Sequence, residues 1–250
     1  MARQSKISTA LAFVGLVIVW QALAVVLNLS TLPGPVAVVF ALYAGISKGL
    51  VLHAAISGYR VVVSIFLAVL LAAPLGLVVG QSRRFDRFAT PLIYLTYPIP
   101  KIVLLPVILI FLGIGEASKI FIISLILFFQ VLVVVRDASN SVRPELIYSV
   151  RSLGAGRMHL FRYVYLPACL PAILTSLRVS TGTAIAVLFF AESFATNSGL
   201  GYYIMVEGWG RMAYADMYAG VVVMSMLGLV IYYALDMMEK RLCGWVQVGR

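Results

Sequence analysis

Apolar residues fall into six long runs along the chain, and the stretches between them hold most of the charged residues. A helix needs roughly 20 residues to cross the hydrocarbon core of a bilayer, where lipid offers no partner to unpaired backbone groups. The runs therefore predict an all-α integral membrane protein with six transmembrane helices, at about 8–27, 57–80, 91–112, 119–135, 168–190 and 215–237.

Composition supports this interpretation. Hydrophobic residues make up 62% of the 250 residues and charged residues only 11%, whereas soluble domains carry about 25% charged residues. Too few polar residues remain to cover a soluble core of this size. We therefore expect residues 1–250 to form a single transmembrane domain, whose function resides in the helices and in the loops between them.

Lysine and arginine are distributed unevenly between the two sides of the predicted bundle. Basic residues concentrate in cytoplasmic loops of membrane proteins, so the richer side predicts cytoplasmic N- and C-termini. The net charge of +10 then reflects topology, and we expect no nucleic-acid partner. The cytoplasmic side collects Arg3, Lys6, Arg83, Arg84, Arg87, Arg136, Arg143, Arg151, Arg157, Arg162, Lys240, Arg241 and Arg250, against Lys48, Lys119 and Arg211 outside.

The first run raises the alternative of a signal peptide, because basic residues precede it and Ala22-Leu23-Ala24 imitates a cleavage site. Its apolar stretch of roughly 18 residues exceeds the usual 7 to 15, which favours an uncleaved anchor. Cys169 and Cys243 lie on the cytoplasmic side, where thiols stay reduced. We expect no disulfide, and no metal site, since His53 and His159 lack partners at ligand spacing.

The third run is interrupted by prolines, which remove backbone donors and kink helices. Irregular backbone inside a membrane needs protein or a water-filled cavity to cover it. The run thus predicts a bent helix beside a transport pathway, although a merely structural kink fits equally well. Lys101 in this run either faces the pathway or extends to the interface. The four prolines are Pro91, Pro98, Pro100 and Pro106.

Two further charges lie in or at the end of the fifth run, and a charge in a span needs a physical reason. Arg178, near mid-span, either attracts an anionic substrate or pairs with another helix. Glu192 closes the span on the outer side, where it pairs with a base such as Arg60 or lines the outer gate. The predicted pathway residues are therefore Pro98, Pro100, Lys101, Arg178 and Glu192.

The loop 136–167 contains a proline, glycines and arginines in a pattern that predicts a short helix, a turn and a second helix. Pro144 suits a helix start, Gly154 and Gly156 suit a sharp turn, and the second helix begins at Arg157. Such a bend suits docking into a groove on a soluble partner; alternatively, its arginines meet anionic lipid head groups. The candidate docking residues are Glu145, Tyr148, Ser149, Val150, Arg151, Leu153, Gly154, Ala155, Gly156 and Arg157.

The stretch RSLGAGRMHLFRYVYLPACLPAILTSLR, residues 151–178, resembles the cytoplasmic coupling loop of ABC-importer permeases. One departure is that Tyr148-Ser149-Val150 replaces the usual Glu-Ala-Ala, with Glu145 one turn earlier as a candidate substitute. The resemblance covers about 57–242 and is closest to the nitrate, taurine and alkanesulfonate branch. It also rests on Arg60-Val61-Val62-Val63, Pro98-Ile99-Pro100, Leu105-Pro106, residues 111–119, Ala191-Glu192 and residues 198–202.

The resemblance implies a type I importer fold, with a five-helix core, an extra N-terminal helix and a cytoplasmic coupling helix, in a prokaryotic inner membrane. It implies partners: two P-loop ATPase subunits, a second and identical permease chain, an external substrate-binding protein and membrane lipid. This chain has no GxxxxGK[ST] motif, so it is not expected to be an enzyme, and ATP and Mg would bind the partner.

The function implied is inward movement of a small anion, such as a sulfonate or nitrate, by alternating access. The alternative is a stand-alone secondary transporter or channel, which would be driven by an ion gradient.

Overall fold

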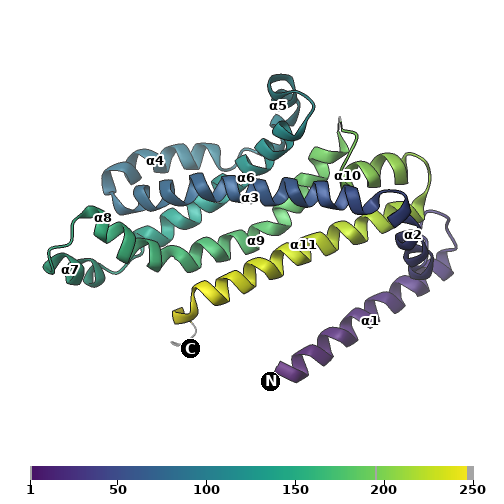
Figure 1. Cartoon of the computed structure of the whole chain (residues 1–250), viewed down its shortest axis with the longest axis horizontal. Helices are drawn as coiled ribbons and strands as arrows, with labels where there is room; N and C mark the ends of the chain where they lie inside the picture. The colour runs from purple at the N-terminus through teal and green to yellow at the C-terminus, as the bar shows by residue number, and fades with distance from the viewer. Residues whose placement is uncertain (1, 195, 247–250) are drawn as a thin grey trace. The chain divides into compact units, whose positions relative to one another are not determined.

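A computed structural model describes residues 2–194 and 196–246, and every regular element in this part of the chain is helical (Figure 1). Four helical stretches are long and apolar enough to cross a membrane. They are α3 (Leu50–Gln81), α6 (Glu116–Asn140), the stretch Arg157–Ser193 that ends in α9 (Leu166–Ser193), and α11 (Tyr214–Leu242).

The predicted break in the third run is present. Helix α4 (Arg83–Thr96) ends before Pro98, and after Pro100 the chain continues as a 3₁₀ turn, η1 (Lys101–Leu104), and α5 (Leu105–Leu112). The two halves are bent by 76°, because neither proline can donate a helical hydrogen bond. Counted together, they make a fifth candidate span.

The expected number of six spans is not confirmed. Helix α1 (Ala2–Leu27) is a single helix, of which the searched part, Val14–Leu27, is a short apolar helix by the same criteria, as is α2 (Pro35–Ser47). That α1 crosses the membrane stays a prediction.

The chain divides into two compact units: one holds the described parts of 1–57 and 192–225, and the other those of 58–191 and 226–250. In the first, Trp20 Nε1 donates to the Pro33 carbonyl at 3.1 Å and the Trp20 ring stacks on Tyr218. Lys48 and Asp216 form an ion pair at 2.9 Å. These contacts connect the α1–α2 pair to the start of α11.

In the second unit, α3 and α6 cross at very short distance. A Cβ atom added to Gly80 would lie 2.4 Å from the Arg136 carbonyl oxygen, and one added to Gly76 would lie 2.9 Å from Val135 Cβ. Ser139 Oγ donates to the Leu77 carbonyl at 3.0 Å across the same crossing. The small-residue pair in the sequence therefore marks a real helix contact.

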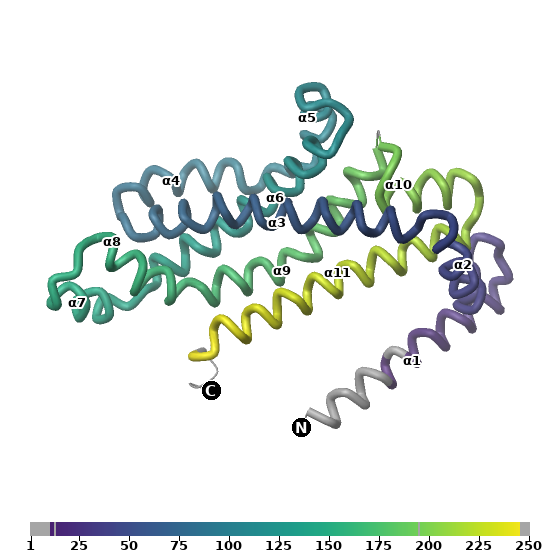
Figure 2. Tube along the Cα trace, viewed as in Figure 1, coloured from purple at the N-terminus to yellow at the C-terminus, as the bar shows by residue number. Residues whose placement is uncertain are grey.

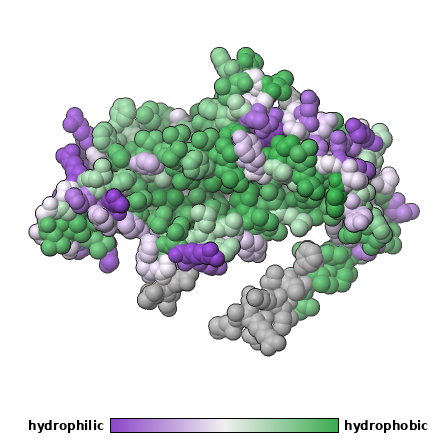
Figure 3. All heavy atoms as spheres, in the orientation of Figure 1, coloured by the Kyte–Doolittle hydropathy of each residue, from purple (hydrophilic) through white to green (hydrophobic). Residues whose placement is uncertain are grey.

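Large apolar side chains are exposed along the candidate spans, among them Phe66, Leu70, Ile110 and Leu229. Figure 3 shows apolar side chains over much of the visible face of the long helices. A surface of this kind is stable against lipid but not against water.

Candidate functional site

The predicted helix, turn and second helix in loop 136–167 are present, although α6 continues to Asn140 before the loop begins (Figure 2). Helix α7 (Pro144–Ser152) is followed by Leu153 and then by Gly154, whose φ is +81°. Gly154 N donates to the Arg151 carbonyl at 2.9 Å and Ala155 N to the Val150 carbonyl at 3.4 Å. This is the Schellman pattern, which favours glycine in the left-handed conformation.

After the turn, Gly156 precedes α8 (Arg157–Leu160), which continues through a π-helical turn, η2 (Phe161–Tyr165), directly into α9. Pro167 lies just after this π-helical turn, so the irregular turn lies where the proline cannot donate a backbone hydrogen bond. The second helix of the loop is therefore the N-terminal extension of a candidate membrane span. We call α7, the turn and α8 the knuckle.

The knuckle is open to its surroundings. Tyr148 is 66% exposed, Leu153 85% and Met158 74%, and a Cβ atom added at Gly154 or Gly156 would meet no heavy atom within 4 Å. Exposed apolar side chains at a rigid bend are typical of a protein-docking surface. Among the candidate docking residues, Glu145, Ser149, Arg151 and Arg157 are also exposed, while Val150 and Ala155 are half-buried.

Lys101 lies at the break in the third predicted span. Its Nζ donates to the carbonyls of Thr96 at 3.0 Å, Tyr97 at 3.3 Å and Ile99 at 3.4 Å, and lies 4.3 Å from the centre of the Phe129 ring. The ammonium group thus satisfies carbonyls near the break at Pro98 and Pro100 and contacts an aromatic face on α6. Lys101 stabilises the irregular backbone itself.

A small polar cavity of about 300 Å³ lies beside this break. Gln130 on α6 donates its Nε2 to Thr183 Oγ1 at 3.4 Å, while its buried Oε1 has no partner. The sequence analysis missed this cavity, although hydroxyl residues at helical spacing in the fifth run were the available signal. Its polar lining comes from Tyr97, Gln130, Thr175, Ser176, Ser180 and Thr183.

Arg178 is held by carboxylates of α11. Its Nη1 donates to Asp236 Oδ1 at 2.6 Å, and its Nε lies 3.6 Å from Glu239 Oε2. Asp236 also accepts from Lys240 at 2.5 Å, and Thr175 donates to Glu239 at 2.9 Å. Of the two interpretations offered by the sequence, this geometry favours pairing between helices.

Arg60 is fully buried and binds Glu116 at the start of α6 through two hydrogen bonds, of 2.7 and 2.5 Å. The sequence analysis considered Arg60 only as a partner for Glu192 and missed Glu116. The pairing of Arg60 with Glu192 stays a prediction.

In the first unit, Glu192 lies in a fully buried hydrogen-bond network. Ser57 Oγ donates to the carboxylate at 2.8 Å and accepts from Leu200 N at 2.8 Å, and Gly201 N donates to Glu192 Oε2 at 2.9 Å. His53 Nδ1 accepts from Gly199 N at 3.0 Å. Glu192 therefore fixes the turn before α10 (Leu200–Tyr202) against the start of α3.

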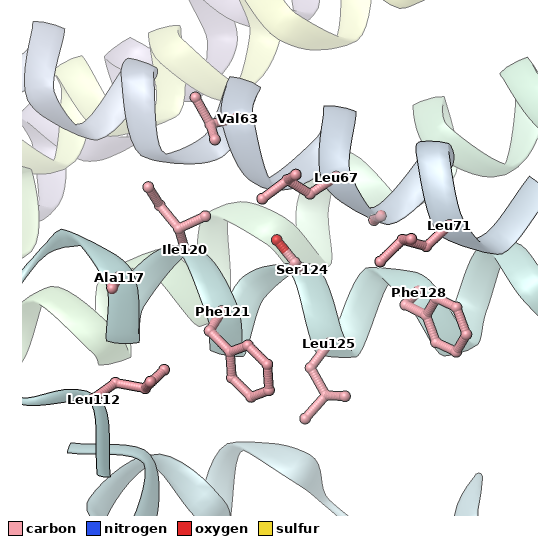
Figure 4. Close-up of a pocket in the computed structure, with 11 residues that line it drawn as sticks. Val63, Leu67, Leu71, Leu112, Ala117, Ile120, Phe121, Ser124, Leu125 and Phe128 are labelled. Atoms are coloured by element: carbon pink, nitrogen blue, oxygen red, sulfur yellow. The ribbon is translucent and has the colours of Figure 1, made fainter. Parts of the chain in front are cut away.

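Another cavity of the second unit has a different character. It holds about 600 Å³ between α3 and α6, near Leu112 at the end of α5, and Figure 4 shows Leu67, Leu71, Ile120 and Phe128 around it. Its polar side chain, Ser124, already donates to the Ser64 carbonyl at 3.3 Å. A charged solute would find no donor there, so this pocket suits an apolar neighbour.

Together, the apolar helices, the broken span and the exposed knuckle define a membrane transport protein. Residues 64–243 match the family described as the inner membrane component of binding-protein-dependent transport systems. The chain belongs to this family. The alternative of a stand-alone secondary transporter or channel is thereby set aside, and the predicted class of fold and function is confirmed.

Curated relatives of this chain are also named as transport permeases. The chain is 35% identical over 194 residues to the taurine transport system permease protein TauC of Escherichia coli (strain K12), covering 77% of this chain and 70% of the relative. It is 31% identical over 195 residues to the putative aliphatic sulfonates transport permease protein SsuC of the same organism, covering 77% and 74%.

The inward-facing methionine ABC transporter MetNI matches with a TM-score of 0.66 at 20% identity, over 79% of this chain and 98% of that one. At this identity the match supports the fold.

Proposed function

We propose that this chain is the permease subunit of an ATP-driven importer that moves a small sulfonate-type anion inward by alternating access. The observation that carries the coupling role is the exposed knuckle, a rigid bend with apolar side chains and no neighbour at its glycines. The names of TauC and SsuC support a sulfonate, and nitrate remains within the same class of small anion.

The proposed assembly contains two copies of this chain, two copies of a P-loop ATPase and an external substrate-binding protein, in a prokaryotic inner membrane with both termini cytoplasmic. ATP and Mg belong to the ATPase. The knuckle residues from Glu145 to Arg157 contact that subunit, with Glu145 providing the acidic group that Tyr148-Ser149-Val150 lacks.

The knuckle is suited to transmit movement. Because α8 continues through the π-helical turn into α9 without a break, a displacement of the knuckle also displaces α9. Four of the hydroxyl groups at the polar cavity, those of Thr175, Ser176, Ser180 and Thr183, lie on this helix. Approach of the two knuckles on ATP binding would therefore change the shape of the cavity along the pathway.

The polar cavity suits a sulfonate because hydroxyl groups can donate to its oxygens without a fixed positive charge. The hydroxyl of Ser176 is already bonded to the Ile173 carbonyl at 2.7 Å, whereas that of Ser180 makes no intramolecular hydrogen bond within the described part of the chain. The Ser180 hydroxyl is thus available to donate to a passing anion.

The coupling role is tested by purifying the tagged chain from its native host and identifying the proteins that co-elute. Gly154→Asp puts a charge on the knuckle, and Gly49→Asp is the matched control, since Gly49 has a φ of +89° and equally open surroundings between α2 and α3. We expect a P-loop ATPase with the wild type and the control, and its loss with Gly154→Asp. Retention of the ATPase by Gly154→Asp would contradict the docking role.

The substrate is tested in vesicles containing the reconstituted importer. Loss of a hydrogen bond to a charged group costs about 1.5 to 3 kcal/mol, so Ser180→Ala should slow taurine uptake about tenfold or more while the ATPase stays bound. Ser176→Ala, whose hydroxyl is already bonded, should have a smaller effect. Equal uptake by Ser180→Ala and the wild type would refute this part of the proposal.

A further inference from the structure

A second polar cavity lies in the second unit, between the α3–α4 turn and the knuckle. It holds about 490 Å³. Three arginines line it, Arg83 from α4 and Arg151 and Arg157 from the knuckle, together with Gln81, Ser82 and Tyr165. We call it the basic pocket. It shares no lining residue with the polar cavity beside the break.

The three arginines have no counter-charge among the residues that the structure describes. In the same unit, Arg60, Arg136 and Arg178 each bind a carboxylate at 2.7 Å or less, but within the described residues none of the three arginines of the basic pocket is in an ion pair, and no carboxylate lines the pocket. Gathering like charges without a partner is unfavourable, so the pocket attracts an anion.

Acidic groups nearby are engaged elsewhere or lie outside the lining. Asp86, in the first turn of α4, accepts from Arg136 at 2.5 Å, and the same arginine binds Asp137 at 3.2 Å. Glu145, on α7, does not line the pocket. Among the residues that the structure describes, no carboxylate therefore neutralises the positive charge of the pocket.

Two uncharged polar residues, Gln81 and Ser82, also line this space. The Nε2 of Gln81 is buried and has no acceptor, and buried amide groups are nearly always bonded. Ser82 is the N-cap residue of α4 but its hydroxyl does not cap the helix, so the first amides of a 14-residue helix are left for an anion. The guanidinium groups, the side-chain amide of Gln81 and the first backbone amides of α4 are all donors suited to the oxygens of a phosphate group.

The remaining wall is apolar, with Phe85 and Leu160 opposite the polar groups. We propose that the basic pocket binds the phosphate group of an organophosphate anion, with an apolar portion of the ligand against this wall, and that binding holds the knuckle to the α3–α4 turn. The phosphate belongs either to a phospholipid head group or to a soluble compound. Binding does not depend on the proposed function; only its effect on coupling does.

The test uses the purified full-length chain in neutral detergent, followed by thermal unfolding. One set of samples receives phosphatidylglycerol, a second phosphatidylcholine, and a third inorganic phosphate against chloride at equal ionic strength. Arg83→Ala removes one guanidinium group from the pocket. Arg84→Ala is the matched control, because the neighbouring arginine is exposed but does not line the pocket.

We expect phosphatidylglycerol to stabilise the wild type and Arg84→Ala, and its apparent affinity to fall about tenfold or more in Arg83→Ala. Arg83→Lys should restore part of it. Gln81→Leu provides an independent variant if Arg83→Ala does not fold. Stabilisation by phosphatidylglycerol alone assigns a lipid head group, and stabilisation by inorganic phosphate as well assigns the phosphate group itself; either supports the proposal.

Three results would overturn it. The first is no stabilisation by phosphatidylglycerol or by inorganic phosphate, and the second is equal stabilisation by phosphatidylcholine and phosphatidylglycerol. The third is equal affinity of Arg83→Ala and Arg84→Ala for phosphatidylglycerol. The co-elution experiment on Arg83→Ala gives a further outcome. If this variant loses the ATPase while phosphate and lipid have no effect on the purified chain, the pocket is assigned to protein docking, which would also overturn the proposal. Since the binding assay contains no ATPase, it can fail while the coupling proposal stands.

Discussion

Replacing Gly80 by alanine is expected to separate α3 from α6. The added Cβ would lie 2.4 Å from the Arg136 carbonyl oxygen and 2.6 Å from Ser139 Cβ. Atoms of the α6 backbone cannot move aside as a flexible side chain can, so the helices must shift apart. The Ser139 hydrogen bond to the Leu77 carbonyl, now 3.0 Å, would lengthen with them.

The magnitude follows from the cost of overpacking a close contact, which is about 1 to 3 kcal/mol. A glycine in open helix responds in the opposite direction. Gly182 lies in α9, and a Cβ there meets no heavy atom within 4 Å, so Gly182→Ala should gain about 0.5 to 1 kcal/mol from reduced backbone freedom. The two substitutions are chemically identical and should have opposite signs.

Thermal unfolding of the detergent-purified chain, followed by the loss of the monodisperse peak in size-exclusion chromatography, measures both. At about 2 to 4 °C per kcal/mol for a chain of this length, Gly80→Ala should lower the Tm by roughly 2 to 12 °C. Gly182→Ala should raise it by about 1 to 4 °C. If Gly80→Ala is as stable as the wild type, the close crossing of α3 and α6 is wrong.

Two further predictions concern the first unit. Ser57→Ala should destabilise the chain by about 1 to 3 kcal/mol, because it removes a donor from buried Glu192 and the acceptor of Leu200 N; an unchanged Tm would refute the network. Burial raises the pKa of the Tyr203 phenol from 10.0 to about 12, so the unfolded chain loses this proton first and stability falls as pH rises between these values. Tyr203→Phe has no phenol to titrate, and it also removes a buried hydroxyl without a partner. The Tm of this variant should therefore exceed that of the wild type by a margin that grows above about pH 10. Tyr202→Phe is the control.

Features set by local sequence were predictable. Apolar length predicted the four long helices, the prolines predicted the break at Pro98 and Pro100, and Gly154 predicted the end of α7. Each depends on a few neighbouring residues and on a general constraint: the thickness of a bilayer, a missing donor or a left-handed φ. Tertiary packing was not needed to recognise any of them.

Features set by packing were not predictable. The partner of Arg60 is 56 residues away at Glu116, and which of several carboxylates it meets depends on how α3 and α6 are rotated about their axes. The polar cavity combines a glutamine of α6 with hydroxyls of α9 and Tyr97, and no spacing within one segment shows such a set. Hydrophobic pattern predicts that a helix exists, but in a span that is apolar all round it carries little information on which face meets which neighbour.

The charges of the second unit divide by place and by role. Within the candidate spans, Arg60, Lys101 and Arg178 are each bound to carboxylates or to backbone carbonyls, because an unpaired charge at this depth is costly. Such groups are already satisfied and hold helices together. A moving anion would then meet hydroxyl groups, whose weaker hydrogen bonds allow both binding and release, as conduction requires. The arginines of the basic pocket lie away from the polar cavity, so a ligand that stays bound there can be strongly attracted without occupying the proposed path of the anion.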